Sequence, residues 1–171
     1  STRYVFLPER LAAPPIEQIR ADLTKHGLAL QPNKHVQIWT TIAGTLHDFY
    51  NDDPREVLKE ADFDAGKLIE LLQTTHRKRF PYLSGPKLSN YWPFILSLFT
   101  DAKFQNPEEI SIIPDTHVLQ SSVRLGVAPD KATSLQVEAA WKELLKGSGI
   151  HPIKVHPVLW HWSRNNFRPA V

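Results

Sequence analysis

Apolar residues along the chain recur at helical spacing, and proline, glycine and acidic residues mark where helices begin and end. Between residues 34 and 51 the apolar side chains fall on one helical face, at Val36, Trp39, Ile42, Leu46 and Phe49 or Tyr50. Alternating β-branched runs bounded by turns, which would indicate strands, are nearly absent. The pattern therefore predicts an all-α protein.

Further helices are predicted on both sides of this segment. Before it, Pro15 opens a helix at Ile16 that Gly27 ends. After it, Asp53 and Pro54 begin a short helix to about residue 61, and Asp64 caps one that runs to the basic residues 76–79. The remaining helices are expected at residues 86–102, with a kink near Pro93, and at 115–125, 134–146 and 157–167.

The segment Phe80-Pro81-Tyr82-Leu83-Ser84-Gly85-Pro86 cannot be helical throughout, because its two prolines and its glycine interrupt a helix. We interpret it as a tight turn. Backbone N–H groups of a glycine turn, here at Ser84 and Gly85, can approach a phosphate, and the helix that follows adds a favourable dipole. The preceding Arg77, Lys78 and Arg79 are either further phosphate contacts or simply cations that suit a helix end.

Composition limits the chemistry. The 171 residues suit one domain, and the formal net charge of +2 with eight histidines permits nucleic-acid binding. The absence of cysteine excludes disulfides, thiolate zinc sites and cysteine-bound iron–sulfur clusters, so catalysis must use Lys, Asp, Glu, His or a hydroxyl. The spacing of His151, His156 and His161 matches no standard zinc pattern, and we expect neither a metal nor a cofactor.

No apolar run approaches the roughly 18 residues that would span a bilayer. Residues 4–7 are too short an apolar stretch for a secretory signal. The sequence therefore predicts a soluble, intracellular protein that does not bind membranes.

Two residues at predicted helix starts have the chemistry of a catalytic pair. Lys87 lies in the first turn of one helix, where the dipole favours the neutral, nucleophilic amine. Such an amine can attack the anomeric carbon of a nucleotide and form a Schiff base as the glycosidic bond breaks. Asp115 begins another helix, and its carboxylate could stabilise the positive charge that develops on the sugar. Alone, each residue has a simpler explanation, as a surface lysine and a helix cap.

Together these segments resemble the helix-hairpin-helix DNA glycosylase superfamily. The hairpin of this family has the form Gly-x-Lys, and an aspartate that begins a later helix follows it. In this chain Gly85, Lys87 and Asp115 match these positions. They lie in the segments Leu83–Lys87 and 113–118. The chain departs from the family pattern in having Leu83 in place of the first hairpin glycine, Ser163 in place of a glycine in the last helix, and a wider gap between lysine and aspartate. The chain is most similar to the archaeal 8-oxoguanine DNA glycosylase branch, which lacks the iron–sulfur cluster.

The resemblance implies a two-lobed helical domain over residues 1–171, with a hairpin at about 80–90, a Pro-Asp motif at about 113–118, and the site facing a cleft. It further implies a monomeric glycosylase and abasic-site lyase, in which Lys87 forms the Schiff base and Asp115 assists. The substrate would be double-stranded DNA with a damaged base, such as an oxidised purine, flipped from the stack. Trp39 and Trp160 are candidates for stacking on that base. A non-catalytic helix-hairpin-helix DNA-binding module and a helical protein-interaction domain are the alternatives.

Overall fold

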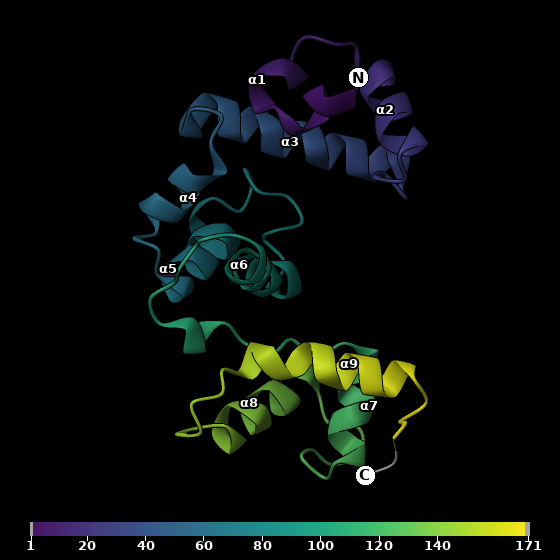
Figure 1. Cartoon of the computed structure of the whole chain (residues 1–171), viewed down its shortest axis with the longest axis vertical. Helices are drawn as coiled ribbons and strands as arrows, with labels where there is room; N and C mark the ends of the chain where they lie inside the picture. The colour runs from purple at the N-terminus through teal and green to yellow at the C-terminus, as the bar shows by residue number, and fades with distance from the viewer. Residues whose placement is uncertain (1, 170–171) are drawn as a thin grey trace. The chain divides into compact units, whose positions relative to one another are not determined.

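The computed structural model describes residues 2–169, and every regular element in that range is helical (Figure 1). The prediction of an all-α protein is confirmed. The chain forms two compact units. One contains the residues up to Phe63 together with Lys67–Gly85, and the other contains Asp64–Gly66 together with the residues from Pro86 on.

The first unit is built around its longest helix, α3. Helices α1 and α2 both pack against α3 (Figure 1), and their shared core includes Val5, Leu11, Ile19, Leu23 and Val36. The elements are η1 (Thr2–Phe6), α1 (Pro8–Leu11), α2 (Ile16–Lys25), α3 (Pro32–Tyr50), α4 (Pro54–Glu60) and α5 (Ala65–Glu70, whose first residues belong to the second unit), followed by the π-helix η2 (Leu71–Thr75).

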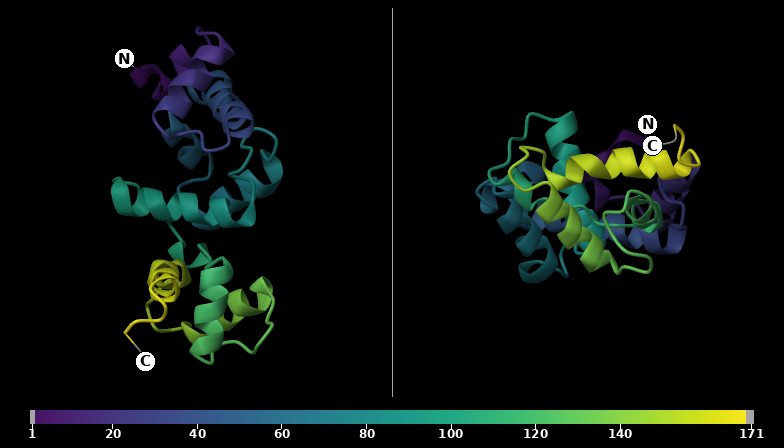
Figure 2. Two further views of the ribbon diagram at one scale, coloured as in Figure 1. Left: turned by 90° about the vertical axis from the view of Figure 1, so that its right-hand side faces the viewer. Right: turned by 90° about the horizontal axis from the view of Figure 1, so that it is seen from below.

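The second unit is built on two helices, α7 and α9, that cross one another (Figure 2). Its main core includes Ile112, Val118, Val137, Trp141 and Leu159. A smaller cluster joins Ala65, Phe94, Ile110 and Ile153. The elements are α6 (Pro86–Phe99), η3 (Pro107–Glu109), α7 (Thr116–Arg124), α8 (Ser134–Leu144), η4 (Pro152–Val155) and α9 (His156–Arg164).

Local sequence signals explain most helix starts. The side chain of Asp53 accepts a hydrogen bond from the N–H of Arg55 at 2.9 Å, and Pro54 occupies the first turn of α4. At α8 the predicted start is reinforced by a capping box, in which Thr133 and Gln136 each receive a backbone N–H of the other.

Two predicted helix ends are wrong by several residues. Helix α6 ends at Phe99 instead of residue 102, because the Thr100 hydroxyl donates to the carbonyl of Leu96 at 2.6 Å and accepts from the N–H of Ala102 at 3.1 Å. Such a hydroxyl competes with the helical hydrogen bonds. Helix α9 ends at Arg164 instead of residue 167, since Asn166 and Phe167 have positive φ angles of 54° and 57°.

A buried hydroxyl joins α7 to α8 in the second unit's core. Ser122 donates to the carbonyl of Val118 at 2.7 Å and accepts from the Trp141 indole N–H at 2.8 Å. Ser122→Ala leaves that N–H buried without a partner, so we expect a loss of about 1–3 kcal/mol in the free energy of unfolding. Urea denaturation of the full chain measures it.

A double-mutant cycle separates this bond from simple loss of volume. In a Trp141→Phe background there is no indole N–H to leave unpaired, so Ser122→Ala should cost clearly less than in the wild type. Equal costs in the two backgrounds would show that the hydrogen bond contributes nothing.

Candidate active site

Lys87 and Asp115, 28 positions apart in sequence, form an ion pair within the second unit. The Nζ of Lys87 donates a hydrogen bond to Oδ2 of Asp115 at 3.0 Å. Lys87 is the second residue of α6, and Asp115 is the N-cap of α7. The two residues that the sequence singled out therefore meet at the starts of two helices.

The two oxygens of Asp115 have different partners. Oδ1 accepts the N–H groups of His117 and Val118, each at 3.1 Å, and so caps α7, while Oδ2 accepts from Lys87. The cap fixes the plane of the carboxylate, because two backbone donors hold one oxygen. Oδ2 is thereby directed at the amine.

Asn90 ties the two helix starts together. Its Nδ2 donates to the carbonyl of Pro86 at 2.9 Å, and its Oδ1 accepts the N–H of Ser111 at 2.8 Å. Asn90 is buried, so neither bond is exchanged readily for water. This side chain links the turn that contains Lys87 to the extended segment that leads to Asp115. Asn90 was not among the residues predicted from the sequence, although an asparagine on the apolar side of a helix is a usable signal.

Asp115 is a carboxylate at neutral pH. Burial acts to raise its pKa, but the hydrogen bonds from Lys87 and from the N–H of Val118, with the charge of Lys87, outweigh burial and hold the pKa of Asp115 below its ordinary value. The side chain of Asp115 is 23% exposed and that of Lys87 is 50% exposed. The amine therefore remains accessible to a ligand while it is paired.

A cavity of about 330 Å³ opens at this ion pair. All of its lining residues belong to the second unit. They come from the start of α6, the cap of α7 and one side of α9, and are Lys87, Leu88, Tyr91, Asp115, His156, Pro157, Trp160 and His161.

Trp160 is one wall of this cavity, and neighbouring side chains hold its ring. The guanidinium of Arg164 lies over the ring at 4.7 Å, and the ring of His117 meets it edge to face at 5.5 Å. His117 is held in turn, because its Nδ1 lies 3.1 Å from the hydroxyl of Ser163. An aromatic wall in a fixed orientation suits a flat ligand.

Trp39, the other tryptophan predicted to stack on a base, lies in the first unit. Its indole N–H donates to the carbonyl of Val5 at 2.7 Å, and its ring meets Phe6 edge to face at 5.7 Å. It lines a separate, mostly apolar cavity of about 300 Å³ between η1, α1 and α3. The structure thus places Trp160, and not Trp39, beside Lys87 and Asp115 among the residues that line the cavity.

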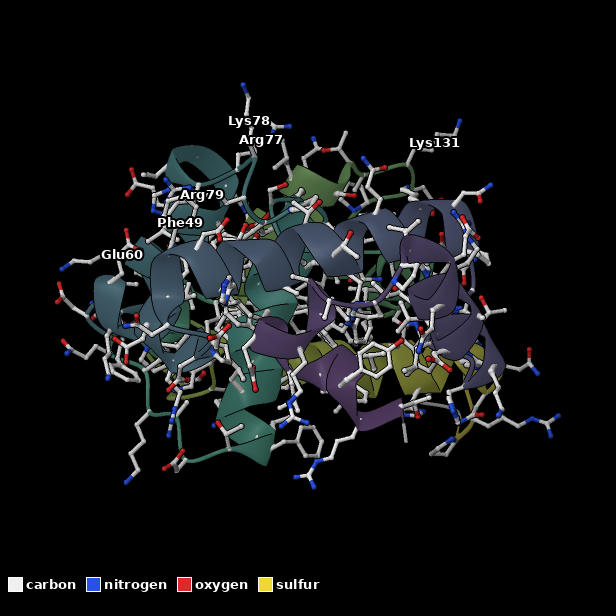
Figure 3. The ribbon with its side chains drawn as sticks, turned by 90° about the horizontal axis from the view of Figure 1, so that it is seen from above. Phe49, Glu60, Arg77, Lys78, Arg79 and Lys131 are labelled. Carbon is white, nitrogen blue, oxygen red and sulfur yellow. The ribbon has the colours of Figure 1, made fainter. Side chains whose placement is uncertain are left out.

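The basic residues 77–79 follow the π-helix η2 in the first unit. The side chains of Arg77 and Lys78 are exposed and extend away from the ribbon (Figure 3). Arg79 instead lies over the ring of Phe49, with its guanidinium 3.7 Å from the ring centre, and its carbonyl accepts from Thr45 at 2.9 Å. Arg77 and Lys78 are therefore the two residues of the run that are available to an anion.

His76, which directly precedes Arg77, takes part in a hydrogen-bond network with Glu60 and Tyr50. His76 contacts Glu60 at 2.8 Å, and the hydroxyl of Tyr50 donates to the same carboxylate at 2.6 Å. Burial acts to raise the pKa of Glu60, but these two bonds and the nearby cations hold it below its ordinary value. Because His76 directly precedes Arg77 in the chain, these contacts hold the backbone at the point where the two exposed cations begin.

The predicted turn is present, but its amides have internal partners. The N–H of Ser84 donates to the carbonyl of Phe80 at 3.0 Å, and that of Gly85 donates to the carbonyl of Tyr82 at 3.1 Å. Tyr82, with a φ of 74°, adopts the left-handed conformation that the turn needs. Phosphate binding by Ser84 and Gly85 stays a prediction, and it requires these two bonds to be shared or replaced.

No protein-family model, curated protein or solved structure matches the chain. Within residues 2–169, no helix is both long and apolar enough to cross a membrane, and no group of three or more acidic or histidine side chains is arranged to hold a metal ion. The geometry of Lys87, Asp115 and their cavity is therefore the main indication of function.

Replacing Asp115 tests the ion pair through the pH dependence of stability. Because the folded state lowers the pKa of Asp115, its contribution is complete above the ordinary value of 3.8 and is lost as pH falls through the folded-state pKa. Asp115→Asn retains a capping oxygen but not the charge. We expect the variant to be less stable than the wild type by about 1 kcal/mol at pH 6, since Lys87 is half exposed, and the difference to shrink below about pH 4.

Urea unfolding between pH 7 and pH 2 measures this difference. Asp101→Asn, at an exposed position, is the matched control and should follow the wild type. A stability difference that stays constant across the whole range would mean that the Asp115 charge does not stabilise the fold.

Proposed function

We propose that this protein is a DNA glycosylase with abasic-site lyase activity, in which the amine of Lys87 forms a Schiff base with the sugar of a damaged nucleotide. The observation that carries the proposal is the 3.0 Å contact between Lys87 Nζ and Asp115 Oδ2 at the mouth of a cavity. It brings an amine nucleophile and a carboxylate to the same place. The resemblance of residues 83–87 and 113–118 to the glycosylase motif points to the same chemistry.

Each residue has a defined role in the proposed reaction. The neutral amine of Lys87 attacks the anomeric carbon while the bond to the base breaks, and the base leaves with the bonding electrons. The carboxylate of Asp115 stabilises the positive charge on the sugar. The sugar ring then opens and leaves an imine between Lys87 and the former anomeric carbon. Loss of a proton from the sugar carbon next to that imine permits strand cleavage by β-elimination.

The cavity is of a size for one small ligand group, since ligand pockets commonly begin at about 300 Å³. The ring of Trp160 offers a face for stacking an extruded base, and every base has such a face. An oxidised purine is the class of base that the sequence resemblance favours.

A non-catalytic DNA-binding module is the second candidate, and one observation favours it. In the resting structure the amine of Lys87 is already paired with the carboxylate of Asp115, and such an ion pair can serve a purely structural role. Catalysis therefore requires a route by which Lys87 loses its proton.

Borohydride trapping on duplex DNA with an abasic site tests the lysine directly. The wild type should form a covalent adduct, and Lys87→Ala should abolish it, because Lys87 is the lysine among the described residues that line the cavity. Lys103→Ala removes an exposed lysine of the same unit and should trap as well as the wild type. Binding without trapping by the wild type would support the non-catalytic module, and no binding at low salt would favour a protein-interaction domain.

The exposed cations of the first unit should contribute to binding through phosphate contacts. The double variant Arg77→Ala/Lys78→Ala should bind undamaged duplex more weakly at every sequence, and the slope of log affinity against log salt should fall by about two. Fluorescence anisotropy at several salt concentrations measures the slope. Arg10→Ala/Lys25→Ala changes the net charge equally from exposed positions of the same unit. The same decrease in that variant would exclude a local contact of Arg77 and Lys78.

A further inference from the structure

His156 is a buried imidazole in the cavity of Lys87 and Asp115. It is the first residue of α9, is 5% exposed, and lines the cavity. Its Nδ1 is buried and has no hydrogen-bond partner among the described residues. A buried polar atom without a partner is costly, so its retention in a cavity calls for a functional explanation.

The proposed reaction requires a group that accepts a proton from Lys87. Lys87 must lose a proton before its amine can attack, and Asp115 is a poor acceptor because its pKa is held low. A useful base has a pKa nearer to neutrality, so an imidazole of this cavity is the natural acceptor.

Several groups of the cavity act on His156. Burial lowers the pKa of His156, the charge of Asp115 raises it, and the charge of Lys87 lowers it, with a net decrease. From α6 the ring of Tyr91 meets it edge to face at 5.6 Å, and His161 lines the same cavity from α9. His156 is therefore neutral at pH 7, and a ring nitrogen has a lone pair for a proton.

We propose that His156 is the general base that removes a proton from the Lys87 ammonium, and that it then returns this proton to the departing base. This inference rests on the proposed glycosylase function. The balance is complete: Lys87 passes one proton to the imidazole, its lone pair forms the bond to the anomeric carbon, and the glycosidic bond breaks with its electrons on the base nitrogen. The imidazolium then protonates that nitrogen, and the positive charge remains on the new carbon–nitrogen bond.

A packing role for His156 makes a different prediction from a proton-transfer role. If the imidazole only fills space against Tyr91, then an amide of similar size preserves the pH dependence of the reaction. If it moves the proton, its removal changes that dependence, because Lys87 must then lose its proton to solvent.

The test is the rate of borohydride trapping on abasic-site DNA, with enzyme in excess, from pH 5 to pH 9.5. The wild-type rate should rise with pH and level off once His156 is neutral. His156→Gln should react about 100-fold or more slowly at pH 7, which is the usual contribution of a general base, and its rate should keep rising tenfold per pH unit into the alkaline range. His151→Gln, at a histidine of the same unit outside this cavity, should follow the wild type.

Failure of this inference is distinguishable from failure of the proposed function. A wild type that forms no adduct overturns both. An active wild type together with a His156→Gln variant whose rate levels off at the same pH overturns the role of His156 alone, whatever the size of the rate change.

A titration of the His156 ring by NMR in the full chain is independent of activity and of the folding of His156→Gln. Because Lys87 lowers the pKa of His156, Lys87→Met should raise it. If the pKa of His156 is the same in Lys87→Met as in the wild type, then Lys87 does not act electrostatically on His156. That result would overturn the inference.

Discussion

The carboxylate of Asp115 both caps α7 and pairs with Lys87, and the site in the second unit is organised around this double role. One oxygen accepts the first free N–H groups of α7, and the other accepts the ammonium of Lys87. A helix start needs such an acceptor, and a buried or half-buried amine needs a counter-charge. Because a single rigid group meets both needs, the position of Lys87 is coupled to the start of α7.

The surrounding structure maintains that coupling. Asn90 joins the first turn of α6 to the extended segment before Asp115 through two partly buried hydrogen bonds. The packing of α9 against α7 brings His156 and Trp160 to the same cavity. The apolar core that includes Val118 and Leu159 stabilises this helix pair. The site is thus built from three helices: α7 and α9 share the main core, and α6 packs through the smaller cluster that contains Phe94 and Ile153.

The features that depend on near neighbours in sequence could be predicted. Asp53 and Asp115 cap helices because their side chains reach amides two or three residues away, and the period of α3 is visible in its apolar residues. The early end of α6 at Thr100 depends on a hydroxyl that donates to one backbone group and accepts from another, and the sequence does not show whether it will do so. Short elements such as η1 and α1 contain too few residues to show a period, and nothing local marks the π-helix η2.

The site divides in the same way. A motif identified Lys87 and Asp115, and their spatial pairing agrees with it. Sequence alone could not separate Trp160 from Trp39, because both lie on partly apolar helices and only the tertiary structure assigns one to the cavity. His156 acquires its importance from Lys87 and Asp115, which lie far along the chain, so no local pattern could reveal it. Asn90 offered a weak local signal, as an asparagine on the apolar side of a helix. Among the basic residues 77–79, the sequence likewise could not show that Arg79 stacks on Phe49, because the two residues meet only in the folded structure.

The ion pair also determines how the proposed reaction is balanced electrostatically. Before reaction, the negative charge of Asp115 faces the ammonium of Lys87; once the amine is neutral, the same carboxylate loses that partner. A positive charge that develops on the sugar takes the place of the ammonium, so the carboxylate does not have to reorient during the reaction. The capping bonds to His117 and Val118 keep it in place through this exchange. The ion pair between Lys87 and Asp115 is therefore oriented in advance for the charge that the proposed reaction would create.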